Sequence, residues 1–461
     1  MIIQLKTLSM KPNILIITTD QQSHNMMSCA GNPWLKTPAM DRLAAMGTRA
    51  ERAYCSNPVC TPSRYSWWTG RMPSSIGVRK NGSPLKELPP EIGSGGLGHQ
   101  LRKAGYETFF GGKAHTPANL SVSSLGFHYY QNNERDLLAI DTAELIRTRS
   151  SQPWCIAANF INPHDICYQA IRAFGKSGAE KGLFERAKIE ITELDKALKI
   201  PEGMDEETFY DKHCPHLPDN HDVQENEPKA IDDLINQRKF RIEARNNWSE
   251  KEWRLHRWAY HRLTERVDRQ IAVVVDALEC SGQMDNTVII FTSDHGDHSA
   301  SHRLEHKTVF YEEAARVPLI VVDPTQKNKG VVNQNTISNV GLDLMTTCCD
   351  YAGIETLDEH KGNSLRNLCE DNADPESGAY GESQIGTMWV SKTHKYCHYD
   401  QCGSEEVLYD LVTDPGETRD CSQDPDKEHI LAQHRQAHDR AKEEHRGLRI
   451  KEIVELEKEL V

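Results

Sequence analysis

Two segments of this chain place a carboxylate directly after an expected buried strand. "NILIITTD" (13–20) and "NTVIIFTSD" (286–294) are short, apolar and rich in β-branched residues, which is typical of central strands in a parallel sheet. Open α/β sheets bind ligands at the carboxyl ends of their strands, so the polar residues there are candidate ligands. They are Asp20, Gln21, Asp294 and His295. Either motif alone is more often a strand-end turn, but together they suit a hard divalent cation if they converge.

Cys60 is either a buried structural thiol or the centre of a reactive site. In "CTPSR", Arg64 lies four residues after Cys60, which is about one helical turn. If the pair Thr61-Pro62 opens a helix, Cys60 lies at the N-terminus of that helix, where the backbone favours an anion. With thirteen cysteines in the chain, the structural explanation is the more common one for any single thiol.

Further cationic and imidazole groups follow strand-like segments, in "GGKAH", "NFINPHD" and "EHKTVF". They are Lys113, His115, His164 and Lys307. The glycines before Lys113 allow close approach of the backbone. A lone lysine or histidine is usually solvated or merely hydrogen-bonded, but a convergent set of them could hold a tetrahedral oxyanion.

The ordered motifs of the chain resemble those of a known family. "CTPSR" followed by "TGR" is similar to the signature of type I, formylglycine-dependent sulfatases, which belong to the alkaline phosphatase superfamily. The other motifs of that family follow in order: "NILIITTDQQ", "GKAH", "NPHD", "TSDHGD", "HKTVFYEEAARVPL" and "LYDLVTDPGE". The resemblance runs from about residue 12 to about residue 420 and identifies the chain as a member of the sulfatases.

The resemblance implies a Ca²⁺ ion and a modified cysteine. The implied metal ligands are Asp20, Gln21, Asp294, His295 and Cys60, with Cys60 converted to formylglycine. Many relatives carry Asp-Asp at the first motif, where this chain has Asp20-Gln21. A glutamine carbonyl still ligates Ca²⁺, but the site loses one negative charge, so Mg²⁺ and Mn²⁺ stay open as alternatives.

The resemblance also implies how sulfate is removed. Hydrated formylglycine, a gem-diol steadied by Arg64, attacks sulfur, while Lys113 and Lys307 bind the sulfate oxygens. His164 protonates the departing alkoxide as general acid. His115 contacts the formylglycine and takes the second diol proton, which expels sulfate and regenerates the aldehyde.

The substrate is expected to be a sulfated carbohydrate derived from a glycosaminoglycan or an algal polysaccharide. The polar segment 169–250, rich in His and Asp, reads as an insertion that lines the pocket and suits a hydrophilic ester. His302 and His306 lie close to Lys307 in sequence and are candidate substrate contacts, whereas Trp67 and Trp68 read as core or wall residues.

Three alternatives stay open for the function. A phosphonate monoester or phosphodiester hydrolase of the same superfamily shares formylglycine and the Asp-Gln start, so Gln21 favours it. A small-molecule sulfatase would act on an aryl or choline ester. A sugar-binding protein without activity is disfavoured, because every charged position expected for catalysis is filled.

The fold expected from the motifs is α/β, with a large, mixed, mostly parallel sheet sandwiched by helices as in alkaline phosphatase. Residues 1–371 are predicted to form the catalytic domain. Residues 372–461 are predicted to form an α+β subdomain with a four-stranded antiparallel sheet and a terminal helix. Apolar spacing predicts helices over 37–47 and about 253–280.

Composition limits partners and compartment. The formal net charge of −14 disfavours nucleic acid and anionic membranes as partners, and no apolar run approaches the ~18 residues of a membrane helix.

The scattered cysteines show no C-x-x-C pair and suggest reduced thiols. The N-terminal segment lacks signal-peptide features, so the chain as given is expected in the cytoplasm, or in the periplasm if a leader precedes it. A formylglycine-generating or anaerobic sulfatase-maturating enzyme is an implied partner, and the oligomeric state stays open.

Overall fold

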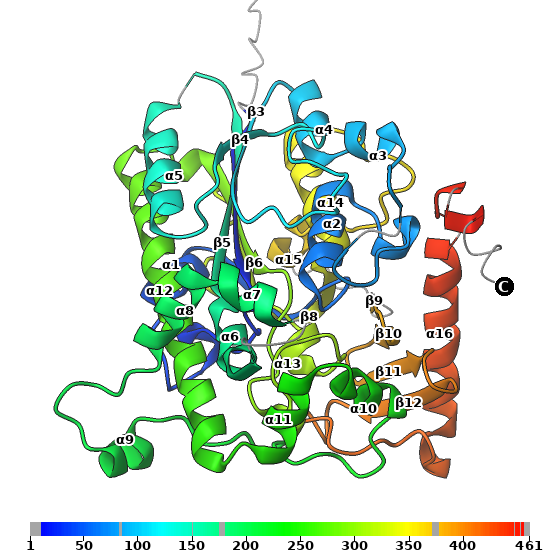
Figure 1. The fold of residues 1–461 in the computed structure, drawn as a ribbon. Coiled ribbons are helices and arrows are strands. Elements are labelled where there is room, and N and C mark those ends of the chain that lie inside the picture. The colour runs from blue at the N-terminus through cyan, green and yellow to red at the C-terminus, as the bar shows by residue number, and fades with distance from the viewer. Residues whose placement is uncertain are drawn as a thin grey trace, which may run out of the picture.

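An eight-stranded mixed sheet forms the centre of the computed structural model (Figure 1). The structure describes residues 11–82, 85–149, 151–174, 180–370, 378–446, 448–451 and 453–455. The strand order is β4-β3-β5-β1-β6-β7-β2-β8, and β7 alone in this sheet runs antiparallel to both of its neighbours. The strands are β1 (Asn13–Asp20), β2 (Thr48–Tyr54), β3 (Glu107–Gly112), β4 (His128–Gln131), β5 (Trp154–Pro163), β6 (Thr287–Ser293), β7 (Leu319–Val322) and β8 (Val331–Asn339).

The two strands predicted to end in a carboxylate are adjacent. β1 and β6 pair in parallel, with Thr19 opposite Ser293. Their burial is continuous, as expected for strands covered on both faces. Asp20 and Asp294 therefore leave the sheet side by side at its carboxyl edge, which confirms that the two motifs converge.

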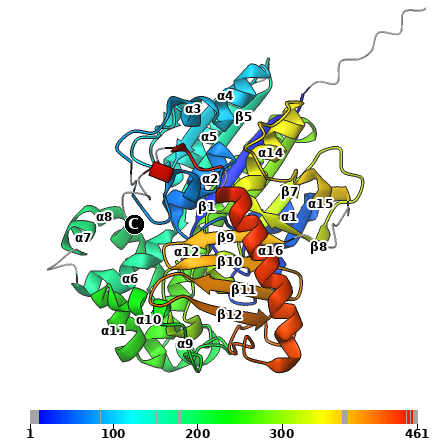
Figure 2. The ribbon, with the colours of Figure 1, turned by 90° about the vertical axis from the view of Figure 1, so that its right-hand side faces the viewer.

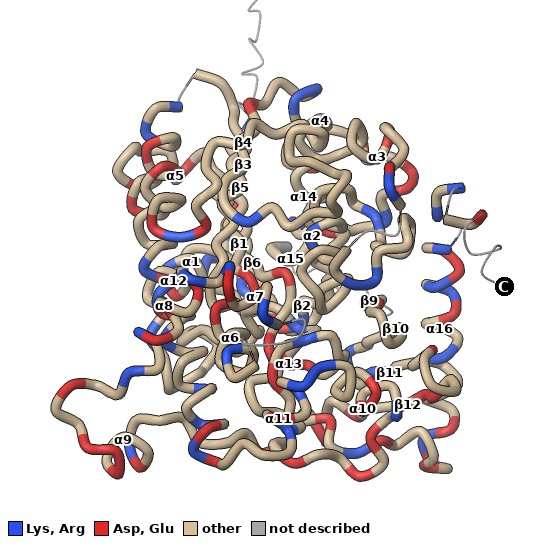
Figure 3. Tube along the Cα trace, in the orientation of Figure 1, with Lys and Arg blue, Asp and Glu red and all other residues tan. Residues whose placement is uncertain are grey.

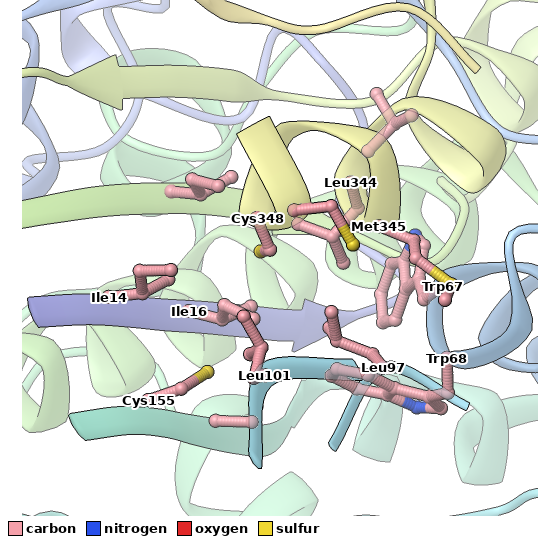
Figure 4. Close-up of a cluster of buried hydrophobic side chains, with 14 of the residues drawn as sticks. Ile14, Ile16, Trp67, Trp68, Leu97, Leu101, Cys155, Leu344, Met345 and Cys348 are labelled. Atoms are coloured by element: carbon pink, nitrogen blue, oxygen red, sulfur yellow. The ribbon is translucent and has the colours of Figure 1, made fainter. Parts of the chain in front are cut away.

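Alternate residues of β1 enter two different cores. Ile14 and Ile16 pack on one face with Trp67 and Trp68, as Figure 4 shows, while Leu15 and Ile17 pack on the opposite face. The period of two along a strand sends successive side chains to opposite faces. The tryptophan pair is thus part of the core, as the sequence predicted.

Helices cover both faces of the sheet. In Figure 1, α1, α5 and α12 lie on one side, and α2, α4 and α14 lie on the other. These six are α1 (Pro38–Met46), α2 (Cys60–Thr69), α4 (Leu97–Lys103), α5 (Asp136–Thr148), α12 (Glu250–Cys280) and α14 (Val340–Ala352). The shorter helices α3 (Pro90–Ser94), α13 (Glu312–Ala315) and α15 (Arg366–Glu370) complete the layers. The two helices predicted from apolar spacing correspond to α1 and α12.

The segment between β5 and α12 is helical, with small apolar clusters of its own. Its helices are α6 (Tyr168–Ile171), α7 (Glu180–Arg186), α8 (Lys188–Ala197), α9 (Glu206–Lys212), α10 (Lys229–Asn236) and α11 (Lys239–Asn247). α12 then begins with a capping box, in which the Ser249 hydroxyl accepts from the Glu252 amide and the Glu252 carboxylate accepts in return.

A second, four-stranded antiparallel sheet has the order β12-β11-β10-β9, and the last long helix packs against it (Figure 2). These elements are β9 (Ala379–Ser383), β10 (Gly386–Val390), β11 (His394–Tyr399), β12 (Glu405–Asp410) and α16 (Glu428–Arg446). The antiparallel sheet and helix agree with the predicted architecture. The predicted domain boundary between residues 371 and 372 lies outside the described residues.

The distribution of charged residues and the state of the cysteines agree with the sequence analysis. Lys and Arg are interspersed with Asp and Glu along the trace in Figure 3. All thirteen cysteines are free, and Cys348 and Cys349 are buried in α14 as core thiols. No helix among the described residues is both long and apolar enough to cross a membrane.

A buried ion cluster joins the two sheets. The Lys395 ammonium of β11 lies 2.7 Å from the Glu312 carboxylate and 2.8 Å from the Glu417 carboxylate, and it donates to the Phe310 carbonyl at 2.8 Å. Lys395 and Glu417 are almost completely buried. Removing one partner of a buried ion cluster leaves the others uncompensated, which is costly.

Replacing Lys395 by alanine is therefore expected to lower the free energy of unfolding by about 3–5 kcal/mol. Urea denaturation followed by tryptophan fluorescence measures the change. The matched control is Lys251→Ala, because Lys251 forms a 2.8 Å ion pair with Glu206 in which both side chains are about 60% exposed. Since exposed pairs contribute little, the control should unfold like the parent. Equal effects of the two substitutions would contradict the assigned role of Lys395.

Candidate active site

The ends of β1 and β6 and the start of α2 bring four potential metal ligands together. One ligand atom from each side chain lies within 4.8 Å of all the others, and all four residues are buried. The group consists of Asp20, Cys60, Asp294 and His295. Two carboxylates, an imidazole and a thiol on rigid elements could hold one divalent cation.

Cys60 is the first residue of α2, as the sequence predicted. Its sulfur lies 3.0 Å from the Lys307 Nζ, 3.2 Å from the His295 Nε2 and 3.7 Å from an Asp20 carboxylate oxygen. Burial and Asp20 raise the pKa of the thiol, but Lys307, Lys113 and His295 outweigh them and hold it well below its usual value. The position therefore favours an anionic group.

Arg64, one turn further along α2, joins the two carboxylates. Its Nε donates to Asp294 at 2.8 Å, its Nη2 to Asp20 at 3.0 Å, and its Nη1 to the Lys113 carbonyl at 2.8 Å. The guanidinium is completely buried. Because Arg keeps its charge and its planar donor geometry, this one side chain fixes both strand ends.

Lys113 follows β3 and lies against Asp20, with 2.7 Å between its Nζ and the carboxylate. The preceding Gly112 has φ +80°, and an added Cβ would lie 2.1 Å from the Asn159 carbonyl oxygen. Glycine is required there because the backbone passes so close to β5. Burial alone would raise the pKa of Asp20, but Lys113, His164 and Arg64 hold it well below its usual value.

Gln21 lies beside this cluster with both ends of its amide engaged. Its Oε1 accepts from the Lys307 Nζ at 2.8 Å and from the Cys167 thiol at 3.0 Å, while its Nε2 donates to Asp297 at 2.6 Å. Its φ of 69° turns the chain at the end of β1. The amide oxygen of Gln21 and the Cys60 sulfur thus contact the same ammonium group.

The two remaining catalytic candidates differ in exposure. His164 follows β5 and is half-buried, and its Nδ1 has no hydrogen-bond partner among the described residues. Burial and Lys113 hold the pKa of His164 well below its usual value. His115 is exposed, two residues after Lys113, and has φ 40°.

The two histidines predicted to contact substrate are both buried, but in different surroundings. The His302 ring stacks on Tyr311 with 3.7 Å between centroids, and its Nε2 lies 3.3 Å from the Asn220 amide. The His306 ring packs against Phe240 of α11 with 5.0 Å between centroids. His306 is adjacent in sequence to Lys307, whereas His302 packs against Tyr311.

Sequence reasoning missed Cys167 and Asp297, which contact Gln21. Asp297 lies inside the quoted motif "TSDHGD", so its place in the motif was the available signal. Cys167 lies three residues after His164, and nothing in the sequence distinguishes it from the other twelve cysteines. Their roles emerge only from the contacts at Gln21.

Comparisons with known proteins agree with the geometry. A family model described as sulfatase matches residues 12–354, and one described as N-sulphoglucosamine sulphohydrolase, C-terminal, matches residues 300–444. A Delta 4,5-hexuronate-2-O-sulfatase of Bacteroides thetaiotaomicron is 29% identical over 95% of this chain and 91% of its own length.

Solved structures share the fold. The structure of a 2-O GAG sulfatase superposes with a TM-score of 0.77 at 28% identity, covering 95% of this chain and 93% of the other. A phosphonate monoester hydrolase of Agrobacterium radiobacter shares the fold at a TM-score of 0.70 and 19% identity, over 94% of this chain and 96% of its own. The sulfatase match spans well over half of the chain and includes the whole buried cluster around Cys60, and this chain accordingly belongs to the sulfatase family of sulfuric ester hydrolases.

Proposed function

We propose that this sulfatase removes sulfate from a sulfated carbohydrate, with formylglycine made from Cys60 as its nucleophile. The observation that carries the proposal is the convergence of Arg64, Lys113 and Lys307 around Cys60. Arg64 and Lys113 are buried and Lys307 is half-buried, and such cations in one small site are costly unless anions compensate them. A sulfate ester supplies such an anion at the position where they meet.

The cluster of Asp20, Cys60, Asp294 and His295 fits a divalent cation, and Ca²⁺ is the proposed ion, with the Gln21 carbonyl as a further ligand. Carboxylate and amide oxygens are the ligands that hard cations prefer. When bound, the ion and the formylglycine supply an activated oxygen nucleophile at neutral pH. Formation of the aldehyde requires a maturation enzyme, either formylglycine-generating or anaerobic sulfatase-maturating.

The side chains of the site then divide the remaining work. Arg64 holds both strand ends, so the carboxylates keep their positions as charge develops on the ester. Lys113 and Lys307 bind the sulfuryl oxygens, where preorganised cations stabilise the transition state. Burial and Lys113 disfavour a proton on His164 in the empty site, and the bound anionic ester would favour one. His164 then gives this proton to the leaving alkoxide, and His115 takes the proton that is lost when sulfate departs.

Two observations favour a carbohydrate ester. The hexuronate-2-O-sulfatase named above and an N-acetylglucosamine-6-O-sulfatase of Bacteroides thetaiotaomicron, 26% identical over 88% of this chain, are named for sugar sulfates. In addition, Arg241 of the insertion lines a small cavity together with Lys307. Its guanidinium donates to the Leu234 carbonyl at 3.0 Å and forms no ion pair with a carboxylate among the described residues, so its charge suits an anionic, hydrophilic substrate better than a flat aryl ester.

His306 and His302 are the proposed contacts to substrate hydroxyl or acidic groups. His306 has the better position, because it is next to Lys307 and packs against the insertion. The competing hydrolase activity on phosphonate monoesters is favoured by Gln21 alone.

A substrate panel tests the proposal directly. The matured protein should desulfate at least one sulfated mono- or disaccharide with kcat/KM well above that for 4-nitrophenyl sulfate and for a phenyl phosphonate ester. Ion chromatography of released sulfate and phosphorus-31 NMR of phosphonate measure the two reactions. Faster turnover of the phosphonate ester would overturn the sulfatase assignment in favour of the competing one.

The modification of Cys60 is expected to be visible by mass and essential for rate. Conversion of cysteine to formylglycine lowers the intact mass by about 18 Da. Cys60→Ala should abolish that shift and lower kcat by about a thousand-fold or more, because the nucleophile is lost. The exposed Cys280 provides the matched control, since Cys280→Ala should keep both the mass shift and the rate.

His164→Ala should reduce turnover in a manner that depends on the leaving group. A general acid matters most when the departing alkoxide is a strong base, so the loss should be about a hundred-fold or more for a sugar ester and far smaller for 4-nitrophenyl sulfate. Initial rates on both esters provide the measurement. An equal loss on both would remove His164 from this role.

A further inference from the structure

Position 21 is a glutamine in this chain, where many sulfatases have the second aspartate of an Asp-Asp pair. The structure shows which residues contact this glutamine. An amide carries no charge, and it has one accepting end and one donating end. Its two ends are not interchangeable here, because the Lys307 ammonium and the Cys167 thiol both donate to one of them.

Asp297 receives the other end. Its Oδ2 accepts from the Gln21 Nε2 at 2.6 Å, and its Oδ1 accepts from the Ser299 amide at 2.7 Å. Its own backbone amide donates to the Ser23 hydroxyl at 3.0 Å. Asp297 is completely buried, and these three hydrogen bonds join it to Gln21, Ser299 and Ser23.

The orientation of the Gln21 amide follows from its partners. The Lys307 ammonium can only donate, so the oxygen of Gln21 must face Lys307 and the reactive centre. The Gln21 NH₂ group then faces Asp297, and both oxygens of Asp297 accept hydrogen bonds. The His256 Nε2 lies 3.6 Å from the Asp297 Oδ1.

We propose that Asp297 is a positioning residue of this sulfatase. It orients the Gln21 carbonyl oxygen toward Lys307 and the metal ligands, and its carboxylate, in contact with Gln21, supplies the negative charge that Gln21 lacks. The inference rests on the proposed metal-dependent function. A carboxylate that holds a metal ligand in place commonly changes metal affinity by 10–100-fold.

The first test is the affinity of metal-stripped, matured protein for Ca²⁺. Asp297→Asn replaces the carboxylate by a neutral amide that can also donate, which weakens the hold on the Gln21 NH₂ group and removes the negative charge beside it. Isothermal titration calorimetry should give a Kd for Ca²⁺ raised by about ten-fold or more. The rise in Tm on adding Ca²⁺, compared with Tm in EDTA, should shrink in parallel.

A second pair of variants separates positioning from a general loss of packing. Gln21→Glu in the parent keeps the length of the side chain, would place two carboxylates at hydrogen-bond distance and should lower Tm in EDTA. Adding Asp297→Asn to Gln21→Glu removes that repulsion and leaves one negative charge beside the ligands. The double variant should therefore recover a higher Tm and a tighter Kd than Gln21→Glu alone, although Asp297→Asn weakens the parent.

Asp343→Asn is the matched control, because Asp343 is a buried carboxylate in α14 that accepts from the Asn363 backbone amide. This control should leave the Kd for Ca²⁺ unchanged. A Kd for Asp297→Asn within two-fold of the parent, or no recovery in the double variant, would overturn the inference. If the parent binds Ca²⁺ and the variants behave as expected, yet no sulfate ester is hydrolysed, the proposed function fails while the role of Asp297 stands.

Discussion

The site depends on holding two buried carboxylates next to each other. Asp20 and Asp294 end adjacent parallel strands, so their charges would repel strongly in a region from which water is excluded. Arg64 resolves this by donating to both of them from the first turns of α2. Its position in turn requires that α2 start at Cys60, so the same helix fixes the proposed nucleophile and neutralises the carboxylates.

The remaining charges are arranged around that bridge. Lys113 pairs with Asp20, while Lys307 contacts the Cys60 sulfur and the Gln21 oxygen. Each lysine comes from a different segment, and Lys113 is buried while Lys307 is half-buried. The cost of burying these cations is met by the carboxylates and by the anionic character of Cys60. Removing any one of these charged groups would therefore leave the others uncompensated and destabilise the site.

Much of this arrangement was predictable from the sequence, because its elements carry local signals. The continuous apolar runs identified β1 and β6, the Thr61-Pro62 pair marked the start of α2, and apolar spacing predicted α12. Ordered motifs then predicted which residues converge.

Contacts between distant segments could not be predicted, because a sequence does not show which buried polar groups meet. The link from Lys395 of β11 to Glu312 of α13 and to Glu417 joins distant segments, and nothing in "THKYCHY" indicates it. The packing of His302 on Tyr311 and the exposure of His115 belong to the same class. In each case tertiary packing decides the role of a residue whose local sequence is ordinary.

Conversion of Cys60 changes the charge balance that the structure displays. With a thiolate at position 60, Lys307 has an anion 3.0 Å away and a carbonyl oxygen 2.8 Å away. An aldehyde carries no charge, so in the proposed mature site Lys307 would keep the oxygen of Gln21 and lose the anion at position 60. The bound ester would then provide an anionic partner, which would tie substrate binding to maturation. A glutamate at position 21 would pair with Lys307 and compete with the ester for the ammonium. A negative charge at Asp297, behind an amide, would leave Lys307 available to the sulfate.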